Sequence, residues 1–173
     1  ETYYLTETSA PSRPMRIGFL GLGWIGRHRM QAMLDTGAIQ AVAISDPSEE
    51  AVDAALQSAP GAAVCHDLDD LLSRDLDGLV IATPSALHAS QSIAALEAGV
   101  AVFCQKPLGR SADEVRAVVE AARRNDRLLG VDLSYRYAEP MQQIRSLLKA
   151  DALGRVFSVD LTFHNAYGPD KPW

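Results

Sequence analysis

The chain alternates between short, almost continuous apolar runs and longer segments in which apolar residues recur every three or four positions. Runs of the first kind are typical of strands buried on both faces, and segments of the second kind are typical of amphipathic helices. The predicted strands cover residues 16–20, 39–45, 63–66, 78–83, 101–105 and 128–135. The predicted helices cover residues 25–36, 48–58, 68–72 and 86–98, and one more begins at a capping box over residues 111–114. This order predicts an α/β fold with a doubly wound parallel sheet.

The pattern changes after Tyr137. Residues 140–150 predict a helix with one apolar side, and residues 156–163 alternate loosely between apolar and polar positions. The second segment predicts the first strand of a different, open-faced sheet. A single strand cannot bury its apolar face alone, so we expect this segment to need partners.

A glycine-rich turn follows the first predicted strand. Gly21, Gly23 and Gly26 have the spacing G-x-G-x-x-G between a strand and a helix, and Asp46 lies 20 residues beyond the last glycine. The first glycine of such a motif permits a tight turn, the second lets the backbone approach a pyrophosphate, and the third lets the helix pack closely. An ordinary strand-to-helix turn also favours glycine. The strand, the helix and the acidic residue together favour a dinucleotide-binding, Rossmann-type site.

The residues around this motif predict which dinucleotide it binds. Trp24 and Ile25 open the helix, whose N-terminus would offer N–H groups to phosphates, and Trp24 is interpreted as packing or as cover for the cofactor. Asp46 would accept hydrogen bonds from ribose hydroxyls and repel a 2′-phosphate. Pro47 and Ser48 supply no compensating cation. The sequence therefore predicts NAD in preference to NADP.

Composition and charge narrow the classes of partner. A net charge of −6 over 173 residues provides no basic surface for nucleic acid or an anionic membrane, so small-molecule partners are favoured. The longest apolar runs fall short of the roughly 20 residues that span a bilayer. Cys65 and Cys104 lack the spacing of a metal site, and we interpret them as buried thiols in a reducing, cytoplasmic compartment. The acidic residues between positions 67 and 77 match neither a calcium loop nor a catalytic pair, and we interpret them as a solvated turn.

Two further segments carry a family resemblance. Thr83 and Pro84 end one predicted strand, with His88 four residues after the proline, and Lys106 and Pro107 follow the next strand. Together with the glycine motif, this ordered set resembles the Gfo/Idh/MocA oxidoreductases, which include glucose-fructose oxidoreductase and inositol dehydrogenase. The likeness covers almost all of the chain after its first 14 residues. Glucose-6-phosphate dehydrogenases have a similar lysine-proline turn, but they are much longer and the surrounding residues fit less well.

The resemblance implies an NAD(P)-binding domain joined to a larger α/β domain, with a hydroxyl of a sugar, inositol or related polyol as the oxidised group. It implies that Thr83, Pro84 and His88 lie along the nicotinamide side of the cofactor and that Lys106 points at the substrate hydroxyl. The position of Lys106 agrees, because ligands bind beyond the carboxyl ends of strands in doubly wound sheets. A surface lysine in a loop is the alternative for Lys106, and a packed or capping histidine is the alternative for His88.

The sequence departs from the family pattern in two ways. Gln105, expected at the cofactor site beside Lys106, stands where the family commonly has glutamate, so hydrogen-bonding capacity is kept but a negative charge that favours protonated lysine is lost. The aspartate and histidine that the family uses for acid/base work would follow soon after Trp173. Arg136, between two tyrosines at a strand end, is a candidate for contact with the cofactor or an interdomain carboxylate, and an ordinary surface ion pair is its alternative.

We therefore predict a tail over residues 1–14, an NAD-binding Rossmann-type domain over residues 15–136 and the beginning of a substrate domain over residues 137–173. The predicted activity is hydride transfer between the nicotinamide and a polyol or sugar hydroxyl, with Lys106 as the catalytic candidate. We expect this chain alone to bind cofactor without turning over substrate. The alternative function is a non-enzymatic NAD-binding module or sensor, and the sequence leaves open whether copies form a homo-oligomer.

Overall fold

The computed structural model describes residues 13–162 and residue 164. The chain divides into two compact units, Glu1–Leu133, here called unit 1, and Ser134–Trp173, here called unit 2. Among the described residues, unit 1 contains all the strands, and unit 2 contains one α-helix and one short 3-10 helix. The strands of unit 1 pack against helices, whereas the apolar residues of unit 2 remain exposed.

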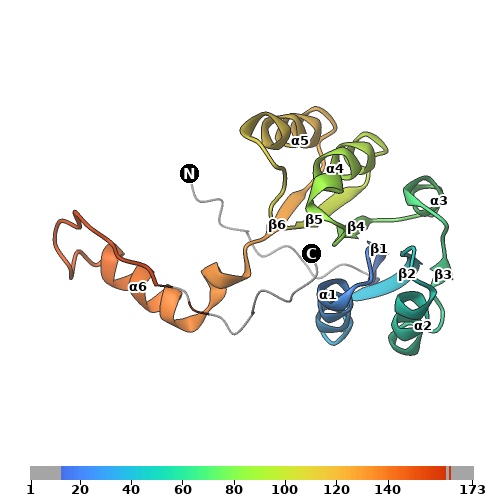
Figure 1. Ribbon diagram of the computed structural model, residues 1–173, viewed down its shortest axis with the longest axis horizontal. Helices are drawn as coiled ribbons and strands as arrows, with labels where there is room; N and C mark the ends of the chain where they lie inside the picture. Colours follow the sequence, from blue (N-terminus) through green and yellow to red (C-terminus); the bar gives the residue numbers. More distant parts are fainter. Residues whose placement is uncertain (1–12, 163, 165–173) are drawn as a thin grey trace. The chain divides into compact units, whose positions relative to one another are not determined.

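The described strands of unit 1 form one parallel sheet (Figure 1). They are β1 (Met15–Leu20), β2 (Ile39–Ser45), β3 (Ala63–Val64), β4 (Gly78–Ile81), β5 (Ala101–Gln105) and β6 (Leu129–Asp132). Their spatial order is β3-β2-β1-β4-β5-β6, and each neighbouring pair is parallel. The chain order reverses between β1 and β4, which is the point where doubly wound sheets bind ligands beyond the carboxyl ends of their strands.

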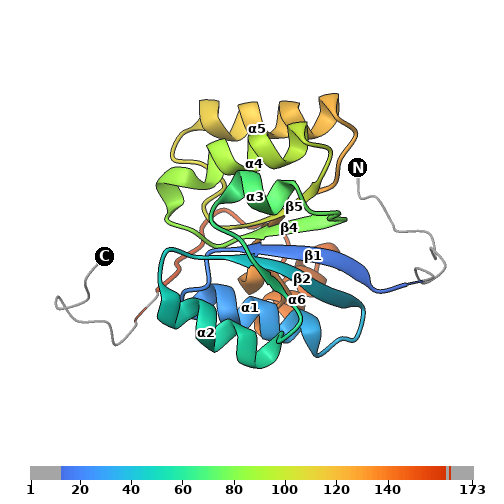
Figure 2. The same cartoon turned by 90° about the vertical axis from the view of Figure 1, so that its right-hand side faces the viewer.

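Helices cover both faces of this sheet (Figure 2). On one face lie α1 (Trp24–Leu34) and α2 (Glu49–Ser58). On the other face lie α3 (Leu68–Leu72), α4 (His88–Glu97) and α5 (Ala112–Arg124), with the 3-10 helix η1 (Ser85–Leu87) leading into α4. The predicted fold class, a doubly wound α/β sheet, is confirmed.

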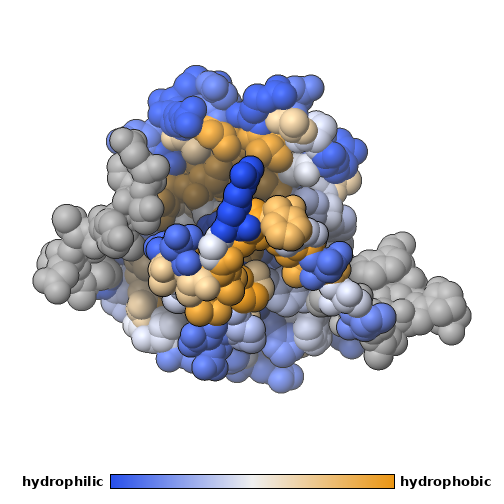
Figure 3. Space-filling view, turned by 90° about the vertical axis from the view of Figure 1, so that its left-hand side faces the viewer, coloured by the Kyte–Doolittle hydropathy of each residue, from blue (hydrophilic) through white to orange (hydrophobic). Residues whose placement is uncertain are grey.

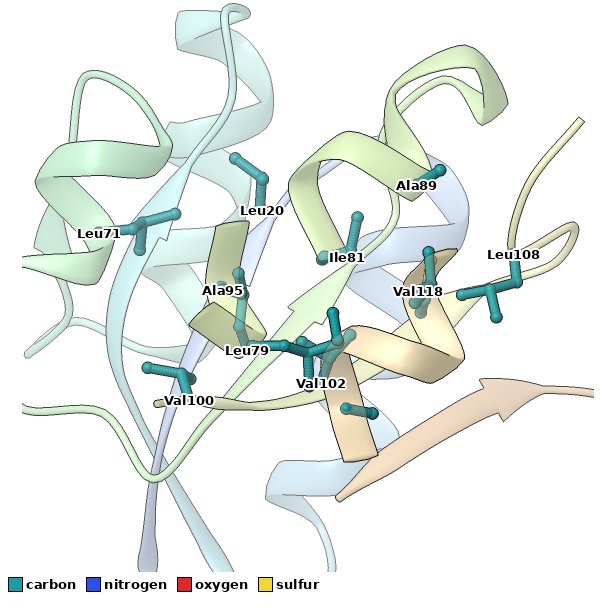
Figure 4. Close-up of a cluster of buried hydrophobic side chains, with 14 of the residues drawn as sticks. Leu20, Leu71, Leu79, Ile81, Ala89, Ala95, Val100, Val102, Leu108 and Val118 are labelled. Atoms are coloured by element: carbon teal, nitrogen blue, oxygen red, sulfur yellow. The ribbon is translucent and has the colours of Figure 1, made fainter. Parts of the chain in front are cut away.

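Two hydrophobic clusters, one on each face, hold the layers together. Successive residues of β4 alternate between them: Leu79 and Ile81 pack with α4 and α5, and Val80 packs with Phe19 on the α1 side. Figure 4 shows the first cluster, in which Leu79 lies close to Val102 of β5. Side chains alternate across a strand, so a strand buried on both faces must be apolar at every position. This requirement explains the continuous apolar runs in the sequence.

The sequence predicted most element positions, with differences at the ends. The bounds of β2 and β5 agree with the prediction, while β6 ends at Asp132, before the predicted end at residue 135. The capping box at α5 is present only in part. Ser111 accepts a hydrogen bond from the N–H of Glu114, but the Glu114 carboxylate accepts the N–H of Arg110 instead of reaching back to Ser111.

The acidic residues between positions 67 and 77 are exposed or half-buried, as a solvated turn requires, but several of their carboxylates also make hydrogen bonds within the protein. Asp67 caps α3 by accepting the N–H of Asp70. Asp77 accepts hydrogen bonds from the Arg13 guanidinium at 2.6 Å and from the N–H of Arg16 at 2.7 Å. The hydrogen bond from the Arg13 guanidinium, followed by that from the Arg16 N–H, holds the pKa of Asp77 below its usual value. These acidic residues therefore tie loops to β1 and α3.

Unit 2 contains η2 (Ser134–Tyr137) and α6 (Glu139–Lys149). The apolar side chains of α6 are exposed, namely Met141, Ile144, Leu147 and Leu148. Hydrophobic side chains also remain exposed after the helix, including Phe157, and Figure 3, which views the side on which Figure 1 draws α6, shows hydrophobic residues in orange.

The strand predicted over residues 156–163 is wrong for its described part, because residues 156–162 form no strand. A strand is defined by hydrogen bonds to a neighbouring strand, and the described residues of unit 2 provide no such neighbour. Residue 163 lies outside the described residues. Across residues 13–162 and 164, none of the helices combines the length and the apolar character needed to cross a bilayer.

Candidate functional site

The glycine turn between β1 and α1 is shaped by two close approaches of backbone to backbone. Gly21 has φ +89°, and a Cβ at this position would lie 2.6 Å from the carbonyl carbon of Ala82, just after β4. A Cβ on Gly26 would lie 2.0 Å from the carbonyl oxygen of Gly21. At Gly23, in contrast, a Cβ would meet nothing within 4 Å. The turn is therefore closed at both ends, and its middle faces open space.

Asp46, directly after β2, fixes the side of this turn. Its Oδ2 accepts the N–H of Leu22 at 2.6 Å, and its Oδ1 accepts the N–H of Ser48 at 2.9 Å. The side chain is half-buried, and each carboxylate oxygen can accept a further hydrogen bond. The carboxylate can thus hold the turn and accept hydroxyl donors from a ligand at the same time.

The N-terminus of α1 carries no cap of its own. Gly23 occupies the capping position without a side chain, and the first turn contains no acidic residue. The helices α2, α3 and α5 are capped by Ser48, Asp67 and Ser111, respectively. Unpaired N–H groups and the positive end of the helix dipole favour an anion at such a terminus.

Trp24 and Ile25, the other predicted residues of the first helical turn, differ in exposure. Trp24 is 66% exposed and packs edge to face with His28, with ring centroids 4.6 Å apart. Ile25 is half-buried. Trp24 therefore stands beside the turn as an apolar surface that a ligand can reach.

The loop after β4 is joined to the loop after β5 by a buried histidine. His88 is 1% exposed, and its Nδ1 and Nε2 lie 2.7 Å and 2.8 Å from the carbonyl oxygens of Pro107 and Thr83. The Thr83 hydroxyl donates to the Gln91 side chain, and Pro84 is exposed. The structure thus places the His88 ring inside the protein, between two loops that border the carboxyl edge of the sheet.

Lys106 follows β5 at the same edge and is exposed. Its N–H donates to Oε1 of Gln105 at 2.9 Å, while Nε2 of Gln105 donates to Oδ2 of Asp132 at 2.8 Å. The same Asp132 oxygen accepts a hydrogen bond from Nε of Arg29, on α1. Gln105 therefore links Lys106 to Asp132 through hydrogen bonds. Its effect on the site is more than the removal of the negative charge that a glutamate would carry.

Sequence reasoning missed Asp132 and Arg29. Asp132 is 6% exposed and ends β6, in register with Gln105 at the end of β5. A charged residue at the carboxyl end of an otherwise apolar strand was the available signal. Arg136 belongs to unit 2, where its side chain is exposed and its carbonyl oxygen accepts a hydrogen bond from Gln142.

Comparison with known families defines the class of protein. The model of the GFO_IDH_MocA family, described as an oxidoreductase family with an NAD-binding Rossmann fold, matches residues 15–133. The chain belongs to this family. The resemblance drawn from the glycine, threonine-proline and lysine-proline motifs is therefore confirmed, as is NAD as the cofactor of the fold.

Curated relatives are dehydrogenases. An inositol 2-dehydrogenase from Rhodococcus erythropolis is 30% identical over 92% of this chain and 47% of its own length. A D-apiose dehydrogenase from Paraburkholderia graminis is 29% identical over 96% of this chain and 44% of its own length. The chain thus spans slightly less than half the length of these relatives, in the NAD-binding part.

A solved structure shares the fold. The WlbA dehydrogenase from Bordetella pertussis, solved in complex with NADH and UDP-GlcNAcA, superposes with a TM-score of 0.77 at 29% identity. The match covers 84% of this chain and 42% of that chain. The carboxyl edge described above therefore belongs to a fold whose members include a dehydrogenase solved with NADH.

Proposed function

We propose that the glycine turn, the N-terminus of α1 and Asp46 hold NAD, and that the enzyme to which this chain contributes oxidises a hydroxyl of a sugar, inositol or related polyol. The observation that carries the proposal is the open space at Gly23, between two glycines whose backbones are crowded. No contact among the described residues requires glycine at position 23. A pyrophosphate approaching the backbone would require it.

The surrounding groups fit the parts of a dinucleotide. The uncapped N-terminus of α1 suits the pyrophosphate, and the Asp46 carboxylate suits the ribose hydroxyls of NAD better than a 2′-phosphate. We expect Thr83 and Pro84 to border the nicotinamide, and His88 joins the carbonyl oxygen of Thr83 to that of Pro107 in the loop of Lys106. Arg136 remains a candidate for a cofactor contact.

The proposed chemistry separates a hydride from a proton. NAD, when bound, accepts the hydride from the carbon that carries the substrate hydroxyl. Lys106 lies in the loop after β5 and would hold that hydroxyl or relay its proton. The division of labour proposed for the chain is NAD binding by residues 15–136 and the beginning of the substrate domain over residues 137–173.

We also propose a cytoplasmic location and small-molecule partners. Cys65 and Cys104 are buried free thiols, as predicted from the sequence. Burial raises the pKa of the Cys104 thiol to about 11, and burial followed by the charge of Asp70 raises that of Cys65. Both thiols are therefore protonated at neutral pH. The proposal of a reducing compartment rests on the two cysteines being free.

A glycine substitution tests the NAD site. Gly23→Ala should change the unfolding curve of the chain little, because the weaker helix cap is offset by the less flexible unfolded chain. It should weaken NADH binding by at least tenfold, because the new methyl group occupies the approach of the pyrophosphate. Gly61→Ala is the matched control, since a Cβ there also meets nothing within 4 Å and the position lies in the loop before β3. Binding is measured by fluorescence titration with NADH. Equal NADH affinity of the two variants would contradict the proposal.

A second measurement separates an enzyme from a non-enzymatic NAD-binding module. Absorbance of NADH is followed over a panel of inositols and sugars, with the 173-residue chain and with a full-length enzyme that contains it. We expect turnover by the longer protein and none by the chain alone. The chain alone should neither orient the substrate nor supply the acid/base group that exchanges a proton with it. NADH binding without turnover in both would favour the sensor.

A further inference from the structure

The network at Asp132 joins three elements of unit 1. Asp132 at the end of β6 lies in register with Gln105 at the end of β5, and its buried Oδ2 accepts hydrogen bonds from Gln105 and from Arg29 of α1. The Asp132 side chain is 7% exposed and that of Arg29 is 29% exposed. A buried carboxylate needs such donors, because an unpaired buried charge is costly.

The hydrogen bonds give Gln105 a fixed orientation. Its Nε2 must point to Asp132, because an ionised carboxylate accepts but does not donate hydrogen bonds. Its Oε1 then faces the N–H of Lys106. One side chain thus supplies a donor to β6 and an acceptor to the loop, and among side chains of this shape only an amide does both at neutral pH.

We propose that Asp132 is a positioning residue for Lys106, acting through Gln105, and that the carboxylate at 132 requires the amide at 105. Arg29 neutralises the carboxylate and extends the network to the helix that begins at the glycine turn. The role given to Lys106 rests on the proposed function, whereas the network itself does not. The proposal makes the residues at 105 and 132 a matched pair.

A charge-exchange cycle tests the pairing. Gln105→Glu places two carboxylates against each other and should raise the equilibrium constant for unfolding about tenfold or more at pH 7. Asp132→Asn should also destabilise, because the Arg29 guanidinium loses its counterion. The double variant has one carboxylate facing one amide and should be more stable than Gln105→Glu alone. Gln40→Glu, at an exposed position of β2, is the matched control for the added charge.

The sign of the coupling decides the pairing. Recovery of stability in the double variant supports the proposal. If the two single effects simply add, so that the double variant is the least stable of the set, the two side chains do not face each other in solution and the proposal is overturned. Gln40→Glu should leave the unfolding curve nearly unchanged.

Hydrogen exchange tests the positioning of Lys106. Gln105→Leu removes the acceptor of the Lys106 N–H, so exchange of that amide, followed by NMR, should accelerate about tenfold or more. The Cys104 amide, inside the β5 ladder, is the internal control and should keep its protection. In Gln105→Glu the Lys106 amide should also lose protection and should recover it when Asp132→Asn is added. Unchanged Lys106 protection in Gln105→Leu would overturn the positioning role.

These measurements use no cofactor. NADH titration of the unmodified chain tests the proposed function separately. If the chain does not bind NADH but the double variant recovers stability, the proposed function is rejected and the hydrogen-bond network is supported. If the chain binds NADH but the effects of the two single variants on stability simply add, the proposed function is supported and the pairing of residues 105 and 132 is rejected.

Discussion

Apolar side chains are buried on the helices of unit 1 but exposed in unit 2. Leu96 on α4 of unit 1 is fully buried, whereas Leu148 on α6 of unit 2 is 49% exposed and Phe157 is 95% exposed. Both helices have apolar residues at helical spacing, and both were predicted. An amphipathic pattern therefore predicts that a helix exists, but it does not show what covers its apolar face.

The largest expected difference between the units is in core stability. Leu96→Ala should lower the free energy of unfolding by about 2–5 kcal/mol, because it removes buried contacts and leaves a cavity. Leu148→Ala should change it by less than about 0.5 kcal/mol, the usual range for exposed positions. Both are measured by urea denaturation of the 173-residue chain. A large loss of stability in Leu148→Ala would show that α6 is covered in solution and would break the comparison.

A substitution of Lys106 separates an effect on the reaction from an effect on NAD binding. In the full-length enzyme, Lys106→Ala should lower kcat/KM by about 10²-fold or more while leaving NAD affinity nearly unchanged, because its proposed contact is with the reacting hydroxyl. Lys149→Ala, an exposed lysine in the last turn of α6, is the control. Steady-state kinetics and NADH titration provide the two readouts. Equal effects of the two variants would make Lys106 an ordinary loop lysine.

Cofactor choice tests whether unit 1 holds the adenosine half by itself. Asp46→Ala should weaken NAD binding by about 1–3 kcal/mol, the usual cost of hydrogen bonds to a charged group. Calorimetric titration with NAD and NADP gives both affinities, and Asp46→Asn, which keeps an acceptor for Leu22, separates ligand contacts from support of the turn. Tighter binding of NADP by the unmodified chain would contradict the role of Asp46.

The smallest effect concerns the acid stability of unit 1. The pKa of Asp77 is lowered in the folded chain, so its stabilising contribution is present above its unfolded pKa, about 4, and is lost as pH falls through the lower folded value. Acidification below about pH 4 should therefore reduce the stability of the unmodified chain more than that of Asp77→Asn. Asp53→Asn, at an exposed position on α2, should keep the unmodified pH dependence. Circular dichroism during urea denaturation at several pH values measures this.

Much of the fold of unit 1 was predictable because its signals are local. The buried runs at 39–45 and 101–105 follow Gly37 and Gly99, whose positive φ values end the preceding segments. The end of β6 was not predicted, because an apolar residue, Leu133, follows Asp132, where pairing with β5 stops. Residues 156–162 show the same limit: alternation is visible in sequence, whereas a pairing partner is not.

The candidate site also combines contacts that the sequence spacing predicts with contacts that only the fold creates. The glycine turn and Asp46 belong to one motif, so their proximity could be inferred from spacing. Arg29 and Asp132 are separated by 103 positions and meet because the folded chain brings helix α1 next to the carboxyl end of β6. No pattern within a short window encodes such a pair.

The buried ring of His88 has a consequence for loop redesign. Because the ring contacts the carbonyl oxygens of Thr83 and Pro107 together, the lengths of the loops after β4 and β5 are matched to the width of one imidazole. An insertion in either loop would pull its carbonyl away from the ring and leave a buried polar group unpaired. Grafting a foreign loop after β5 therefore requires transplanting the loop after β4 with it.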